Sequence, residues 1–207
     1  GKIVMITGAT AGIGKETARA LQKMGAKVVI VGRNAQKTAN VVAEIKAQNP
    51  TGGEVDGMVA DLSSLVDIRR LAEEFRSKYE RLNVLVNNAG AYFNKRELSV
   101  DGYEMTFALN HLNYFLLTSL LLETLKASAP ARIINVSSDS HKGAHLDFDD
   151  LQSEQGAFVF KAYGRSKLAV VVFSYELARR LLGTNVTVNA LHPGLVRTAF
   201  AGNLGAV

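Results

Sequence analysis

The sequence contains no cysteine and only four histidines in 207 residues. The lack of cysteine excludes disulfides, thiolate zinc sites and cysteine nucleophiles. His141 and His145 are four residues apart, but they lie in the segment 140–157, which we expect to be a loop rather than a helix, so we expect no metal site. Redox chemistry would need a bound organic cofactor. Lys and Arg outnumber Asp and Glu by 24 to 19, but no basic run occurs, so we expect no nucleic-acid partner. The net charge of +5 instead suits a small anionic ligand.

Long hydrophobic runs are also lacking. The strongly apolar stretches at 114–122 and 168–173 fall short of the roughly 18 to 20 residues that cross a bilayer. We therefore expect no membrane span or signal peptide in this chain and a cytoplasmic location, with an anchor outside this window left open. The content of 47% hydrophobic and 21% charged residues predicts one globular domain over residues 1–207.

Short apolar runs alternate with segments of helical periodicity. The runs are typical of strands buried on both faces and cover residues 2–7, 27–31, 55–60, 82–87, 131–136 and 185–191. The helical segments cover residues 14–24, 35–48, 65–79, 102–126 and 158–182. This alternation predicts an α/β fold, a Rossmann-type doubly wound parallel sheet in three αβα layers. Residues 140–157 are expected to form a long loop that borders a site.

A glycine-rich loop follows the first predicted strand. Its sequence is Thr7-Gly8-Ala9-Thr10-Ala11-Gly12-Ile13-Gly14, and it leads directly into a helix. Glycines permit a tight turn and close backbone approach, and the helix N-terminus offers N–H groups to a pyrophosphate. The spacing is Gly-x3-Gly-x-Gly rather than GxGxxG, and such a loop alone could be only a turn. The loop predicts a dinucleotide site.

Further motifs follow this loop along the chain: Asp61-Leu62, Asn87-Asn88-Ala89-Gly90, Asn110, Ser138, Tyr163-x3-Lys167 and Pro193-Gly194. In this order, over residues 3–198, they resemble the short-chain dehydrogenase/reductase family. Residues 106–112, 115–118 and 162–169 are similar to the retinol dehydrogenase-like branch. Relatives of this kind continue past residue 198 with a substrate-covering helix and a seventh strand, so we expect the C-terminal part of the domain to be missing here.

The resemblance implies a role for each motif. The implied cofactor-binding residues are Thr7, Gly8, Thr10, Gly12, Ile13 and Gly14 at the pyrophosphate, Asp61 and Leu62 beside adenine, Asn88, Ala89 and Gly90 at the adenosine ribose, Pro193, Gly194, Val196 and Thr198 at the nicotinamide, and Tyr163 and Lys167. Taken singly, Asp61 could equally be a helix cap. The implied catalytic residues are Asn110, Ser138, Tyr163 and Lys167.

The end of the second strand indicates which nicotinamide cofactor binds. An acid about 20 residues past the glycine loop would bind the ribose of NAD, but that place holds Gly32-Arg33-Asn34, and residues 17–43 contain no Asp or Glu. Arg33 can pair with a 2′-phosphate, with Asn34 and Lys37 close by. Arg33 could also be a solvated cation, and Ala11 stands where many NADP-using relatives have a second basic residue. On balance these residues favour NADP(H).

Tyr163 and Lys167 lie four residues apart and share one face of a predicted helix. Reduction of a ketone or aldehyde places negative charge on oxygen, so the site needs a proton donor of suitable pKa. We expect the Lys167 ammonium to favour the ionised phenol. By resemblance, Ser138 polarises the carbonyl and Asn110 holds a water for proton relay. Of the neighbouring side chains, we expect Ser137 to be structural and His111 to pack or bond to the backbone.

The expected activity is NADP(H)-dependent interconversion of an alcohol and a ketone or aldehyde, on an apolar small molecule as in the retinol dehydrogenase-like branch. Two alternatives stay open. One is an enzyme similar to light-dependent protochlorophyllide reductase, whose characteristic cysteines are missing. The other is a nucleotide-binding scaffold or sensor without turnover, because fold alone does not establish activity. The two long helices could also pair copies of the chain in a homo-oligomer.

Overall fold

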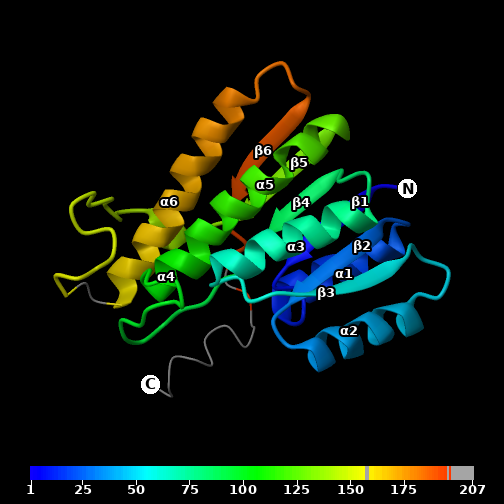
Figure 1. The fold of residues 1–207 in the computed structure, drawn as a ribbon, viewed down its shortest axis with the longest axis horizontal. Helices are drawn as coiled ribbons and strands as arrows, with labels where there is room; N and C mark the ends of the chain where they lie inside the picture. The colour runs from blue at the N-terminus through cyan, green and yellow to red at the C-terminus, as the bar shows by residue number, and fades with distance from the viewer. Residues whose placement is uncertain (157–158, 195, 197–207) are drawn as a thin grey trace.

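The computed structural model describes residues 1–156, 159–194 and 196, and places a parallel sheet at the centre (Figure 1). Its six strands have the order β3-β2-β1-β4-β5-β6. They are β1 (Ile3–Thr7), β2 (Lys27–Gly32), β3 (Val55–Val59), β4 (Val84–Asn87), β5 (Ala131–Val136) and β6 (Val186–Leu191). The order reverses between β1 and β4, as in doubly wound folds, where ligands bind beyond the strand ends at this point. The predicted fold class is confirmed.

The helices follow the predicted segments with one exception. The regular ones are α1 (Gly12–Lys23), α2 (Ala35–Gln48), α3 (Leu65–Lys78) and α6 (Val159–Arg180). The fourth predicted helix is divided into α4 (Met105–Phe107), a π-helical turn η1 (Ala108–Leu112) and α5 (Asn113–Ala127). Its predicted start at residue 102 is wrong, because Gly102 has a φ of +81° in a turn. Glu104 begins the helix instead, since its carboxylate accepts the N–H groups of Thr106 and Phe107 at 2.8 Å each.

The long segment after β5 is irregular, as predicted, apart from the short 3₁₀ turn η2 (Asp139–His141). Within its described part, Gln152 ties it to the chain preceding α4: the Gln152 carbonyl accepts Arg96 Nε at 3.0 Å, and its side chain accepts the Glu104 N–H at 2.7 Å. Arg165 of α6 donates to the carbonyl of Asp150 and the hydroxyl of Ser153. The loop is therefore held on two sides.

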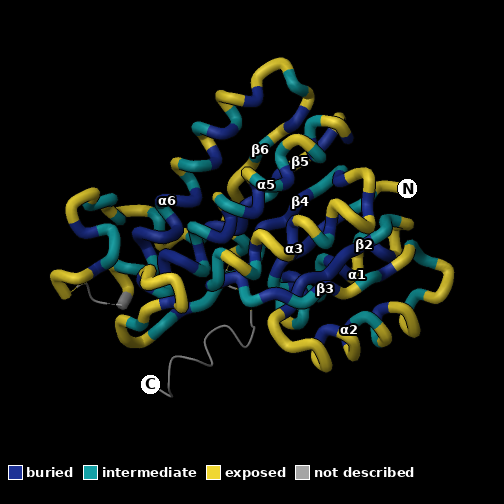
Figure 2. Tube along the Cα trace, viewed as in Figure 1, coloured by how far each residue is buried: buried dark blue, intermediate teal, exposed yellow. Residues whose placement is uncertain are grey.

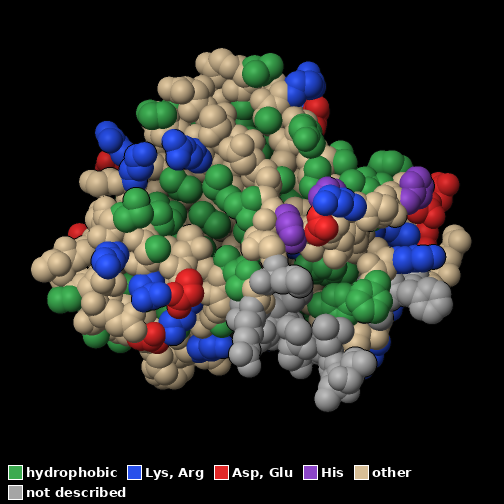
Figure 3. Space-filling view, turned by 180° about the vertical axis from the view of Figure 1, so that it is seen from behind, with side chains coloured by type: hydrophobic (Ala, Val, Ile, Leu, Met, Phe, Trp, Pro, Cys, Tyr) green, Lys and Arg blue, Asp and Glu red, His purple; other side chains and the backbone are tan. Residues whose placement is uncertain are grey.

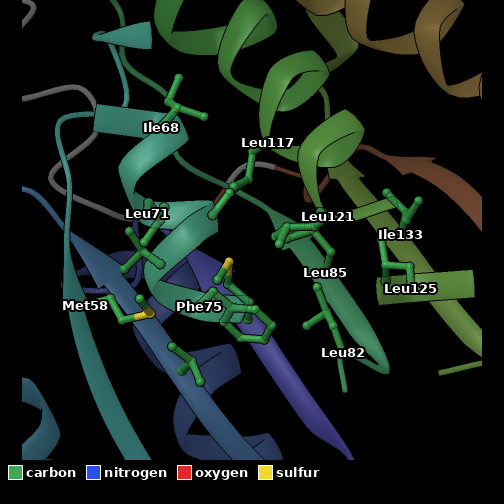
Figure 4. Packing of buried hydrophobic residues seen from close by; sticks show 14 of the residues in the cluster. Met58, Ile68, Leu71, Phe75, Leu82, Leu85, Leu117, Leu121, Leu125 and Ile133 are labelled. Atoms are coloured by element: carbon green, nitrogen blue, oxygen red, sulfur yellow. The ribbon is translucent and has the colours of Figure 1, made fainter. Parts of the chain in front are cut away.

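Alternate residues of the strands face two hydrophobic clusters, one on each face of the sheet. Met5 and Leu85 join the cluster under α3, α5 and α6, which Figure 4 shows from close by. Val4 and Ile6 join the second cluster, under α1 and α2. Figure 2 shows buried residues along the strands and exposed ones on the outer turns of the helices. The sheet thus lies between two layers of helices.

The segment Met105–Ala127 is a longer apolar helix than the stretches found in the sequence, so it bears on the expectation of no membrane span, which remains a prediction. It has 23 residues, and an 18-residue window within it reaches a mean hydropathy of 1.2, which is long and apolar enough to span. Half of that window is buried inside the structure. Leu117, Leu121 and Leu125 are fully buried in the core against α3. A core helix meets the same criteria, so length and composition alone assign no membrane span.

The fold predicts a large effect of truncating Phe75. This ring is fully buried on α3 and packs 4.8 Å from the Tyr79 ring. Replacing Phe75 by Ala should lower the free energy of unfolding by about 3 to 5 kcal/mol, because transfer energy and packing are both lost. Urea unfolding measures this. Val66, 71% exposed on the same helix, is the matched control, and Val66→Ala should change stability by less than about 0.5 kcal/mol. Equal effects at the two positions would contradict this packing.

Candidate active site

The predicted cofactor motifs meet where β1 and β4 end. The Thr7 hydroxyl, fully buried, accepts the N–H groups of Asn88 and Ala89 at 2.9 and 3.0 Å and lies 3.4 Å from the Val86 carbonyl, to which it donates. The Asn88 side chain donates to the carbonyls of Thr7 and Gly8 at 2.8 and 3.2 Å. Thr7 and Asn88 therefore join two strand ends, and their side-chain polar groups are largely used within the protein.

The glycines of the loop allow backbone segments to approach closely. A Cβ on Gly8 would lie 2.7 Å from the Ala89 Cα, and one on Gly14 would lie 2.6 Å from the Asn88 side chain. Gly12 begins α1 with a φ of +53°, which favours glycine. The first turn of α1 contains no acidic residue, and Ala11 at its N-cap gives no side-chain hydrogen bond. Its N–H groups can therefore bind a phosphate, which fits the predicted role of the loop.

The end of β2 lies beside this loop, because Gly32 directly faces the side chains of Thr10 and Thr38. Arg33 follows and is exposed, and none of the residues described here forms a hydrogen bond or ion pair with its guanidinium. Lys37 is also exposed. Asn34, however, caps α2, since its side-chain oxygen accepts the Lys37 N–H at 2.8 Å. The position of Arg33 fits a 2′-phosphate, whereas Asn34 has only its amide hydrogens to offer.

The Asp61-Leu62 motif follows β3, and its aspartate does not cap the next helix, α3. Asp61 accepts hydrogen bonds from the N–H and hydroxyl of Ser63 at 2.9 and 2.7 Å, and Ser64 is the residue that caps α3. The alternative that Asp61 caps the helix is therefore wrong. Leu62 is buried in the core cluster. Its side chain faces the interior, so only its backbone can contact an adenine ring.

Asn110 lies in the π-helical turn, which the sequence analysis missed. Its side chain is fully buried and donates to the Ala91 carbonyl at 3.0 Å, while the Ala91 N–H donates to its oxygen at 2.9 Å. It also donates to the Ser166 hydroxyl at 3.2 Å. Asn110 thus fixes the chain just after Gly90 and joins it to α6. Its proposed role in holding a water stays a prediction.

Lys167 lies in the middle of α6 and is only 3% exposed. Its ammonium donates to the Val136 carbonyl at 2.9 Å and lies 5.7 Å from the centres of both the Tyr163 and Tyr114 rings. Burial lowers the pKa of Lys167 to about 8. A Cβ on Gly90 would lie 3.0 Å from the Asn110 oxygen and 3.5 Å from Lys167 Nζ. Lys167 and Asn110, two of the predicted catalytic residues, therefore both lie next to Gly90 of the Asn87-Asn88-Ala89-Gly90 motif.

Tyr163 is half-buried, and its side chain is hydrogen-bonded to Ser138. Burial raises the pKa of Tyr163, the bond with Ser138 lowers it, Tyr92 raises it further, and the net direction is upward. This corrects the expectation that Lys167 makes the phenol more acidic here. The ammonium lies over the ring and is bonded to the Val136 carbonyl, so the loss of solvent dominates.

Neighbouring predictions have mixed outcomes. Ser137 is structural as predicted, because its buried hydroxyl donates to the Lys167 carbonyl at 2.9 Å. His111 packs between Phe107 and Phe173, and burial lowers its pKa to about 4. Within the described ranges its Nδ1 has no hydrogen-bond partner, so only the packing expectation holds.

The segment after β6 is described only in part. Gly194 has a φ of +79°, Pro193 is partly buried and Val196 is exposed, whereas Thr198 lies outside the described residues. The site also contains Ile13, which is partly buried in the first turn of α1. Within the described ranges, the predicted residues lie at or after the carboxyl ends of the six strands, apart from Asn110 in η1 and Tyr163 and Lys167 in α6.

Comparison with known proteins agrees with this geometry. A family model described as short chain dehydrogenase matches residues 2–206. The chain belongs to this family. It is 45% identical over 206 residues to retinol dehydrogenase 13 of Homo sapiens, covering 99% of this chain and 62% of that protein. It is 48% identical over 198 residues to retinol dehydrogenase 12 of Homo sapiens, covering 96% of this chain and 62% of that protein. The resemblance to the retinol dehydrogenase-like branch is confirmed.

A solved structure, the Pseudomonas aeruginosa RhlG/NADP active-site complex, has a similar fold. It superimposes with a TM-score of 0.81 and 33% identity, covering 98% of this chain and 75% of that one. The chain spans a little under two thirds of the length of the two retinol dehydrogenases it matches. Its described residues bring together a glycine-rich loop, a buried ammonium and a phenol.

The buried ammonium predicts how stability depends on pH in a Lys167→Met variant. The folded protein releases the Lys167 proton near pH 8, but the unfolded chain does so near pH 10.4. The unfolded state therefore binds more protons between these values, and the wild type gains stability as the pH rises. The stability of Lys167→Met relative to wild type should thus fall between about pH 7 and pH 10. Urea unfolding at both pH values measures this, and a constant difference would contradict it.

Proposed function

We propose that this protein is an NADP(H)-dependent oxidoreductase that interconverts an alcohol and a ketone or aldehyde. The observation that carries the proposal is the convergence of Ser138, Tyr163 and Lys167: the Tyr163 phenol is bonded to Ser138, and the Lys167 ammonium lies over the Tyr163 ring and beside Gly90. Bound NADPH would supply a hydride to the carbonyl carbon, or NADP would accept one from the alcohol. The side chains of this site supply the complementary proton chemistry.

Each side chain has a role in the direction of reduction. The Ser138 and Tyr163 hydroxyls hold the carbonyl oxygen, and as negative charge develops there Tyr163 donates its proton to it. The Lys167 ammonium, 5.7 Å from the ring centre, attracts the negative charge of the resulting phenolate, although the loss of solvent outweighs this attraction and keeps the pKa of Tyr163 raised. With its pKa lowered to about 8, Lys167 remains mostly protonated at neutral pH. Oxidation of the alcohol reverses these steps.

The choice of NADP(H) rests on Arg33, which has no hydrogen-bond or ion-pair partner among the described residues and directly follows Gly32, the residue that faces Thr10 of the loop. The NADP in the RhlG complex supports the same choice. An apolar substrate is supported by the similarity to retinol dehydrogenases, and retinoids are one candidate. The same similarity does not favour the protochlorophyllide reductase alternative. Turnover of a carbonyl panel with NADPH separates an enzyme from a scaffold or sensor.

Several further predictions accompany this proposal. A homo-oligomer could form through α5 and α6, where Phe115 is half exposed against Phe173. Figure 3 shows Lys and Arg side chains dispersed among neutral and apolar ones on the face turned away in Figure 1. The absence of a nucleic-acid partner, the cytoplasmic location and a single domain over residues 1–207 remain predictions.

Replacing Tyr163 by Phe should nearly abolish turnover and leave NADPH affinity within a few fold. The phenol acts on the developing oxyanion and not on the cofactor phosphates, so the loss falls on kcat. Steady-state NADPH oxidation and fluorescence titration measure the two quantities. Retention of more than about a tenth of kcat would reject Tyr163 as the proton donor.

Replacing Arg33 by Ala should weaken NADPH binding about tenfold to a hundredfold, with little change for NADH. A charge-assisted bond to the 2′-phosphate contributes about 1.5 to 3 kcal/mol, and NADH lacks that phosphate. Isothermal titration of both cofactors tests this, with Arg69→Ala, an exposed cation on α3, as control. Equal losses for both cofactors, or a wild-type preference for NADH, would show that Arg33 does not select NADP.

A further inference from the structure

Tyr92 lies two residues after Gly90 and is only 5% exposed. The backbone before it is fixed, because both polar groups of Ala91 are bonded to the Asn110 side chain. The π-helical turn thus sets the place of Tyr92. None of the roles assigned above uses this residue.

The Tyr92 ring packs between two aromatic rings of α6. Its centre lies 5.4 Å from the Tyr163 ring at an interplanar angle of 55°, and 5.4 Å from the Phe160 ring at 57°. Residues 160, 163 and 167 share one face of the helix. Phe160 is 75% exposed, so Tyr92 packs against an exposed ring on one side and against the Tyr163 ring on the other. It therefore limits how far the Tyr163 ring can turn.

The hydroxyl of Tyr92 takes no part in these contacts. It is buried and has no hydrogen-bond partner among the residues that the structure describes. A buried hydroxyl without a partner is unfavourable, and burial raises the pKa of Tyr92, so the group stays neutral. The ring, rather than the hydroxyl, makes the contacts that the structure describes.

We propose that Tyr92 is a positioning residue for the reaction at Tyr163: its ring holds the Tyr163 ring in the orientation in which the phenol bonds to Ser138. The inference rests on the proposed function. Asn110, through Ala91, thereby supports the proton donor as well as the backbone near the cofactor motif. A phenol that turns away from Ser138 would no longer meet the substrate oxygen.

Three variants test the proposal in the full-length chain. Tyr92→Leu removes the ring, Tyr92→Phe keeps the ring and removes only the hydroxyl, and Tyr175→Leu makes the same change at an exposed position of α6. Turnover is measured with NADPH and the best carbonyl compound of the panel, per correctly folded protein from cofactor titration. Tyr92→Met replaces Tyr92→Leu if the latter does not fold.

Tyr92→Leu should lower kcat about tenfold to a hundredfold, because a misplacement of about 1 Å at the reacting group has effects of this size. Its NADPH affinity should stay within about threefold of wild type. Tyr92→Phe should restore kcat to within about threefold and unfold at the same or a higher temperature. Tyr175→Leu should match wild type. A loss in Tyr92→Phe as large as in Tyr92→Leu, or an unchanged kcat in Tyr92→Leu, would overturn the proposal.

A measurement without turnover separates this proposal from the proposed function. The ultraviolet difference between each protein and its Tyr163→Phe counterpart reports ionisation of the Tyr163 phenol alone. Because the bond with Ser138 lowers the pKa of Tyr163, Ser138→Ala should shift this titration to higher pH in wild type and in Tyr175→Leu. In Tyr92→Leu the phenol has turned away from Ser138, so Ser138→Ala should shift the titration much less. If wild type reduces no carbonyl but this difference between the shifts occurs, the proposed function fails and the positioning contact stands. An equal shift in wild type and Tyr92→Leu overturns the positioning role.

Discussion

The buried hydroxyl of Thr7 is the contact on which the candidate site depends. Parallel strands end at one edge of a sheet, but β1 and β4 lead into crossovers of opposite direction, so their loops would diverge. Thr7 prevents this by bonding to the backbone of Val86, Asn88 and Ala89. The glycine loop and the segment up to Gly90 are thereby held together, and Asn110 and Lys167 pack against that segment.

A second constraint is the exclusion of water beneath the site. Lys167 is buried without a carboxylate partner among the residues described, and its ammonium bonds to a carbonyl of β5. The same low polarity lowers the pKa of Lys167 and raises that of Tyr163. Burial therefore destabilises the charged forms of both side chains, which are the Lys167 ammonium and the Tyr163 phenolate. Charge that develops nearby interacts strongly with them, because little solvent is present to screen it.

Polar side chains extend this arrangement into the interior, where sequence reasoning did not place them. Asn87 donates to Asn135 at 2.8 Å and to Thr118 at 3.0 Å, and Asn135 donates to Ser174 at 2.8 Å. This chain links β4, β5, α5 and α6 directly below the site. In the sequence, the only indication of this network was one Asn near the end of each of two otherwise apolar strands, Asn87 in β4 and Asn135 in β5. Such residues make buried contacts that define the relative positions of their helices.

The sequence by itself determined the order of strands and helices along the chain, the glycine-rich loop before α1, and the shared face of Tyr163 and Lys167 on α6, because hydrophobic period, glycine placement and helical spacing are local properties. Arg33 could be placed in the same way, since the end of β2 follows from the strand pattern. Tertiary structure decided the rest. The π-helical turn at Asn110, the cap at Ser64 rather than Asp61, the capping role of Asn34 and the ring of Tyr92 against Tyr163 all depend on contacts or backbone geometry that the folded chain sets. The raised pKa of Tyr163 also depends on tertiary structure, because burial is a property of the folded chain and not of any sequence motif.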